Sequence, residues 1–105
     1  MEKRRHERFK LNVEAEFAYQ DQKGARILCR VTTKDISCQG IFLLTGISLE
    51  VGTQLKVDVY LPNYMLKDGP KQSVLSGTGQ VVRTTELGMG IDFVKTFLKP
   101  ADQVQ

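Results

Sequence analysis

The chain has 105 residues, of which 41% are hydrophobic, and its formal net charge is +3. This length suits one compact domain, because folding at this size buries roughly two-thirds of the surface that an unfolded chain exposes. No apolar run approaches the roughly 20 residues of a membrane-spanning helix, and the first ten residues lack the apolar stretch of a secretory signal. We therefore expect a single domain, residues 1–105, that is cytoplasmic and does not insert into a membrane.

The excess positive charge lies in the N-terminal arm, residues 1–10. The arm holds five basic and two acidic side chains, whereas the remainder of the chain holds ten of each sign. Basic residues spread over one face would indicate a nucleic-acid groove, but a neutral body with a short cationic arm favours a small anionic ligand. We therefore expect no nucleic-acid partner.

Alternation of apolar and polar residues predicts the first strands. Residues 13–20 alternate with a period of two, and residues 54–61 do so most clearly. Turn-forming residues at 21–24 separate the first of these segments from a second strand at about 26–33, which predicts a hairpin.

Three further segments complete the expected sheet. Residues 40–45 are apolar on both faces, which fits a short strand covered on both sides. Residues 72–85 are rich in strand-forming types but are interrupted by Gly77 and Gly79, as at a barrel corner where a strand bends. Apolar residues at alternate positions of 88–93 indicate a last strand.

Six short strands without helical periodicity predict an all-β fold, a six-stranded antiparallel β-barrel. The barrel would span residues 11–94, between the basic arm at 1–10 and a short tail at 95–105. The two cysteines, Cys29 and Cys38, have no CxxC spacing, and with one histidine in the chain they cannot complete a structural zinc site. We expect free thiols, no metal and no cofactor.

Three arginines in the arm, Arg4, Arg5 and Arg8, include the pattern RxxxR. Guanidinium groups are planar forks that match phosphate oxygens and the O6/N7 edge of guanine, which lysine cannot reproduce. Three such groups within a short segment favour binding of a bis-phosphate from more than one side. Taken alone, the segment is more typical of an ordinary solvated basic terminus.

A second motif, DxSxxG, follows the second strand at Asp35, Ser37 and Gly40. An ionised carboxylate can accept from both N1–H and N2–H of guanine, and a serine hydroxyl can donate or accept. Glycine lets the backbone approach a ligand closely or adopt a φ angle that other residues resist. A plain Asx or serine turn with a left-handed glycine would explain the same residues, but the two motifs together favour a guanine nucleotide with more than one phosphate.

Three features occur in the order and at the spacing of PilZ domains. They are RxxxR, DxSxxG and a late glycine-paired strand at 88–93 (GMGIDF). The chain resembles that family over nearly its whole length. The resemblance implies a six-stranded barrel with the bacterial second messenger cyclic di-GMP as its ligand. It also implies that Arg4 and Arg8 contact phosphate and guanine, and that Asp35, Ser37 and Gly40 form the barrel side of the site.

The expected function is that of a receptor whose arm orders over the barrel when the nucleotide binds and so creates a surface for an unidentified downstream protein. We expect a monomer or a weak homodimer. Arg30 and Arg83 lie on predicted strands and are further candidates for ligand contact if they face outward.

Enzymatic activity is the least expected class, because no nucleophile has a convincing base and the single histidine, His6, lies in the arm. Two alternatives remain open at this point. One is a ligand-free protein interaction module. The other is a single-stranded nucleic-acid-binding barrel, which would need exposed aromatic residues, and Tyr60 is the one expected to be exposed on a strand.

Overall fold

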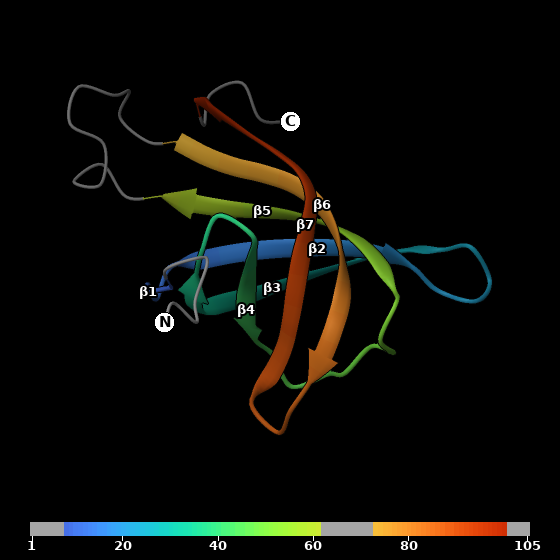
Figure 1. The fold of residues 1–105 in the computed structure, drawn as a ribbon. Coiled ribbons are helices and arrows are strands. Elements are labelled where there is room, and N and C mark those ends of the chain that lie inside the picture. The colour runs from blue at the N-terminus through green and yellow to red at the C-terminus, as the bar shows by residue number, and fades with distance from the viewer. Residues whose placement is uncertain (1–7, 62–72, 101–105) are drawn as a thin grey trace.

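The computed structural model describes residues 8–61 and 73–100, and all regular structure in these residues is β-strand. No helix within them is long and apolar enough to cross a membrane. The strands are, in chain order, β1 (Phe9–Lys10), β2 (Glu14–Gln20), β3 (Arg26–Ile36), β4 (Gly40–Leu44), β5 (Gln54–Leu61), β6 (Ser73–Thr84) and β7 (Gly88–Pro100) (Figure 1).

Six of these strands close into an antiparallel barrel, which confirms the predicted fold. The order around the barrel is β3-β2-β5-β6-β7-β4, and β4 pairs back to β3. Strand β1 lies outside this ring and pairs only with the end of β3, where Phe9 is opposite Ile36 and Lys10 is opposite Asp35. The last two residues of the predicted arm are therefore part of the sheet.

The predicted hairpin is formed by β2 and β3, which pair from Glu14 opposite Thr32 to Gln20 opposite Arg26. Asp21 stabilises its turn, because Oδ1 of Asp21 accepts hydrogen bonds from the backbone N–H groups of residues 23 and 25 at 2.9 and 2.8 Å. Strand β3 continues to Ile36, three residues beyond the predicted end. Asp35 of the DxSxxG motif is therefore a strand residue.

The last strand is also longer than the predicted 88–93. Strand β7 pairs with β6 as far as Pro100, so residues 95–100, expected in the tail, belong to the sheet. The register between β6 and β7 shifts between Thr78 and Gly79, where the glycine interruption predicted a bend. The remainder of the expected tail, residues 101–105, lies outside the described residues.

The barrel interior is filled by the inward-facing residues of the strands. Phe17 is completely buried, and Tyr19 and Phe93, also expected in the core, are partly buried and pack against it. In β4, the side chains on both faces are buried. Ile41 belongs to the core cluster, whereas Phe42 faces outward and is still only 4% exposed. The predicted two-sided cover of this strand is confirmed.

Candidate functional site

The DxSxxG motif lies where β3 turns into β4. Asp35 is the second-last residue of β3, Ser37 begins the turn, and Gly40 begins β4. This junction lies beside β1, so the end of the arm and the motif occupy the same part of the barrel surface (Figure 1).

A β-bulge at Lys34 brings the carboxylate of Asp35 to the surface. The pairing of β3 with β4 shifts register between Thr33 and Asp35. Thr33 is completely buried, and strict alternation from it would point Asp35 inward. With one extra residue inserted, Ile36 packs against the core instead, and the Asp35 side chain lies at the surface with 14% of its area exposed.

Arg8 of RxxxR contacts Asp35 of DxSxxG directly. Its Nε donates to Oδ1 of Asp35 at 2.9 Å, and its Nη2 donates to the same oxygen. Nη1 of Arg8 lies 3.5 Å from Oγ of Ser37, at the long limit for a hydrogen bond. Lys34 Nζ lies 3.3 Å from the other carboxylate oxygen, Oδ2. The structure thus brings one residue of the first motif together with two of the second.

The carboxyl group of Asp35 is held in its ionised form. Burial raises its pKa, but hydrogen bonds and positive charge from Arg8, and then from Lys34, more than offset this effect, so the pKa lies below its ordinary value. At neutral pH the group is therefore a carboxylate that accepts hydrogen bonds and donates none.

Ser37 organises the turn. Its Oγ accepts hydrogen bonds from the backbone N–H groups of Gln39 and Gly40, both at 3.2 Å, and its own N–H donates to the carbonyl oxygen of Gly40 at 2.8 Å. The side chain is almost completely buried. The serine-turn interpretation therefore describes the local geometry, and this turn determines how β4 leaves β3.

Gly40 is required by packing and not by its φ angle. The glycines with positive φ among the described residues are Gly24 and Gly52, so the left-handed conformation considered for Gly40 is wrong. A Cβ at Gly40 would collide with the backbone carbonyl oxygen of Ile91 in β7. Glycine at this position permits the close approach of β4 and β7.

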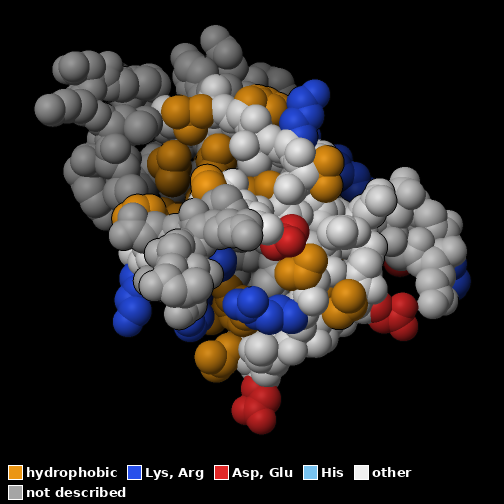
Figure 2. All heavy atoms as spheres, in the orientation of Figure 1, with side chains coloured by type: hydrophobic (Ala, Val, Ile, Leu, Met, Phe, Trp, Pro, Cys, Tyr) orange, Lys and Arg blue, Asp and Glu red, His pale blue; other side chains and the backbone are white. Residues whose placement is uncertain are grey.

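A row of paired residues extends the site across β4, β7 and β6. Asp35 lies opposite Phe42, Phe42 opposite Gly90, and Gly90 opposite Arg83. Two cations cover the Phe42 ring: Lys34 Nζ lies 5.7 Å and Arg83 Cζ 5.6 Å from its centroid. Figure 2 shows Lys and Arg side chains gathered on this face, where β4 lies in Figure 1.

Sequence reasoning named Arg83 as a conditional candidate and missed Lys34. The sequence signal for Lys34 was its position directly before Asp35. Adjacent residues on a regular strand point to opposite faces, however, so alternation argued against placing Lys34 in the site. Only the bulge places both side chains on the same face. Arg30, the other conditional candidate, donates from Nε to Oε2 of Glu16 at 2.9 Å and is not part of this site.

Arg4 and Arg5 lie outside the described residues. In the part of the chain that is described, no three His, Cys, Asp or Glu side chains lie close enough together to hold a metal ion. Cys29 and Cys38 are not joined in a disulfide.

A family model for the PilZ domain matches residues 2–102. The chain belongs to the PilZ family. PilZ domains are cyclic di-GMP-binding modules of bacterial signalling and are known as receptors rather than enzymes. No match was found among curated proteins.

The close approach of β4 and β7 at Gly40 leaves no room for a side chain. Gly40→Ala should destabilise the domain by about 1–3 kcal/mol, because the methyl group meets backbone that cannot move away cheaply. Thermal unfolding followed by circular dichroism measures the effect. Gly46→Ala is the matched control, since a Cβ there meets no atom within 4 Å and φ is not positive. Equal unfolding temperatures for the two variants would contradict the packing argument.

Proposed function

We propose that this PilZ domain is a non-enzymatic cytoplasmic receptor for cyclic di-GMP, which it binds between the N-terminal arm and the outer face of β3 and β4. The observation that supports this most is the contact between Arg8 and Asp35, because it joins the two sequence motifs on one barrel face. The proposed ligand-binding residues are Arg4, Arg5, Arg8, Asp35, Ser37 and Gly40.

Ligand binding at this site requires an exchange of hydrogen-bond partners. Oδ1 of Asp35 accepts two hydrogen bonds from Arg8, and Oδ2 lies 3.3 Å from Lys34 Nζ. The parallel N1–H and N2–H donors of guanine would need one position on each oxygen, so both Arg8 and Lys34 would have to give way. Arg8 would then turn its planar fork to a phosphate or to the O6/N7 edge of a guanine. The Asp35 carboxylate accepts hydrogen bonds from Arg8 in the free protein and would accept them from guanine in the complex. Binding therefore does not cost the desolvation of an unpaired carboxylate.

Ser37 and Gly40 contribute to ligand binding by fixing the backbone around Asp35. Ser37 and Gly40 fix the turn and the start of β4, and so hold Asp35 in place relative to the arm. Lys34 and Arg83 extend the positive surface beyond Asp35, on the side where a second phosphate or base of the ligand would lie. We include these two as contributors to the same site.

The nucleic-acid alternative needs exposed aromatic residues, and Phe9 and Phe97 are the exposed aromatic side chains among the described residues. Tyr60, which was expected to be exposed, is partly buried. Its hydroxyl donates to Oε1 of Glu16 at 3.1 Å, and Glu16 lies opposite Asp58 in the adjacent strand. Burial raises the pKa of Tyr60, and the hydrogen bond to Glu16 and its charge raise it further. An aromatic ring whose hydroxyl is bonded to a carboxylate is a poor stacking platform for a polyanion.

The fork geometry of Arg8 can be tested by a charge-conserving change. Arg8→Lys should weaken cyclic di-GMP binding nearly as much as Arg8→Ala does, because one ammonium group cannot make two parallel contacts to a planar acceptor. Isothermal titration calorimetry provides the dissociation constants. Arg30→Lys, which alters an arginine paired with Glu16 away from the motifs, should leave the affinity unchanged. Wild-type affinity for Arg8→Lys would mean that the arm acts only as diffuse positive charge.

We further propose that the nucleotide orders the arm over the barrel and that the resulting surface is recognised by a downstream protein. Hydrogen–deuterium exchange over residues 4–10 should slow when cyclic di-GMP is added, because the arm gains hydrogen bonds to the ligand. Exchange over residues 54–61 in β5, far around the barrel, serves as the internal control. Saturable binding without slower exchange in the arm would refute the ordering step and leave the receptor function intact.

A further inference from the structure

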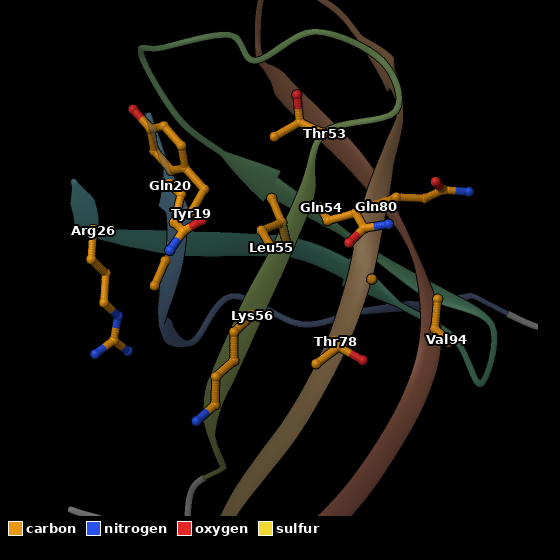
Figure 3. Close-up of a pocket in the computed structure, with 12 residues that line it drawn as sticks. Tyr19, Gln20, Arg26, Thr53, Gln54, Leu55, Lys56, Thr78, Gln80 and Val94 are labelled. Atoms are coloured by element: carbon orange, nitrogen blue, oxygen red, sulfur yellow. The ribbon is translucent and has the colours of Figure 1, made fainter. Parts of the chain in front are cut away.

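A hollow lies on the opposite side of the barrel from the DxSxxG motif. Around the ring, β5 is three strands from β4 in either direction. The hollow is about 760 Å³ and is lined by residues of β2, β5, β6 and β7, together with Thr53 just before β5 and Arg26 at the start of β3 (Figure 3). This volume falls in the range of ligand-binding clefts, roughly 300–1,000 Å³.

Strand pairing arranges the outward-facing lining residues in two rows across the outer face, whereas Leu55 and Tyr19, also in the lining, belong to the core or pack against it. In one row, Ala18 lies opposite Lys56, and Lys56 opposite Thr78. Ala18 is small and only 7% exposed, so the longer side chains around it rise above it. Ala18 therefore forms the floor of the hollow.

The second row consists of side-chain amides. Gln54 lies opposite Gln80, and Gln20 at the end of β2 lies opposite Arg26. All three glutamines are exposed. Each amide carries a donor and an acceptor, the same pair of groups that a peptide backbone presents.

The charge of the hollow has one sign. Its lining includes Arg26 and Lys56 and no carboxylate. Within residues 8–61 and 73–100, neither cation has a carboxylate within ion-pair distance. Figure 3 shows both cations on one side of the hollow and Val94, which is 77% exposed, on the other. The lining therefore offers positive charge on one side and an apolar contact on the other, and two carboxylates of the described strands, Asp58 and Asp92, lie in the neighbouring positions of β5 and β7.

We propose that this hollow binds an extended acidic peptide segment of a partner protein. Residues of the two rows, such as Gln54 and Lys56 on β5, are two positions apart along a strand, roughly 7 Å. Alternate side chains of an extended peptide lying along β5 have the same spacing. Carboxylates of the peptide pair with Arg26 and Lys56, and its backbone groups pair with the glutamine amides. Two cations with three neutral amides match a peptide better than a nucleic-acid strand, whose phosphates require a longer basic track.

Nuclear magnetic resonance of the full chain labelled with ¹⁵N tests the proposal. The probe is an acetylated and amidated eight-residue peptide of alternating glutamate and threonine, and the controls replace its glutamates with glutamine or with lysine. The acidic peptide should shift the side-chain amide signals of Gln20, Gln54 and Gln80. The amide of Gln39, in the DxSxxG turn, should not move. The test needs no cyclic di-GMP, so its outcome is independent of the receptor function.

A matched pair of variants assigns the interaction to the hollow. Lys56→Gln should weaken peptide binding about two- to fivefold, as expected for one exposed charge pair. Lys10→Gln, the same change on β1, should leave it unchanged. No shift of the three amides at millimolar peptide, equal shifts with the lysine peptide, or equal affinity for the two variants would overturn the proposal. Stronger shifts of these amides by oligodeoxythymidine would assign the hollow to nucleic acid and overturn it as well.

Discussion

Strand β3 carries one extra residue at Lys34, and this bulge determines where the carboxylate of Asp35 lies. In a regular strand the side chains of Thr33 and Asp35 would share a face, and that face is the core. The bulge keeps Thr33 inside, returns Ile36 to the core and leaves Asp35 at the surface within reach of Arg8. The contact between the arm and the barrel depends on this local change of register.

Close packing of β4 against its neighbours supports the bulge. Gly40 permits β4 to approach β7, and Ser37 closes the turn that precedes it. Phe42, on the outer face of β4, is in turn covered by Lys34 and Arg83. A nucleotide at this site would therefore meet a surface that is fixed by backbone packing and carries positive charge on long side chains.

Sequence reasoning predicted the barrel for an identifiable reason, and it named Arg8 and Asp35, which the structure brings into contact. Alternation in residues 13–20 and 54–61 reflects burial on one face, and this burial is what the structure shows. The role of Gly40 could not be predicted, because it depends on Ile91, far along the chain. The surface position of Asp35 beside Lys34 could not be predicted either, because a bulge alters the alternation from which strand faces are inferred.

We propose that Asp35 recognises guanine through a pair of hydrogen-bond donors that adenine lacks. Isothermal titration calorimetry of the protein with cyclic di-GMP and with cyclic di-AMP tests it most directly, since the two ligands share their phosphates and differ in their bases. We expect saturable heat with cyclic di-GMP and binding of cyclic di-AMP that is weaker by about five- to 150-fold, because one good bidentate base contact is worth about 1–3 kcal/mol. Equal affinities, or no heat with cyclic di-GMP from a folded sample, would contradict it.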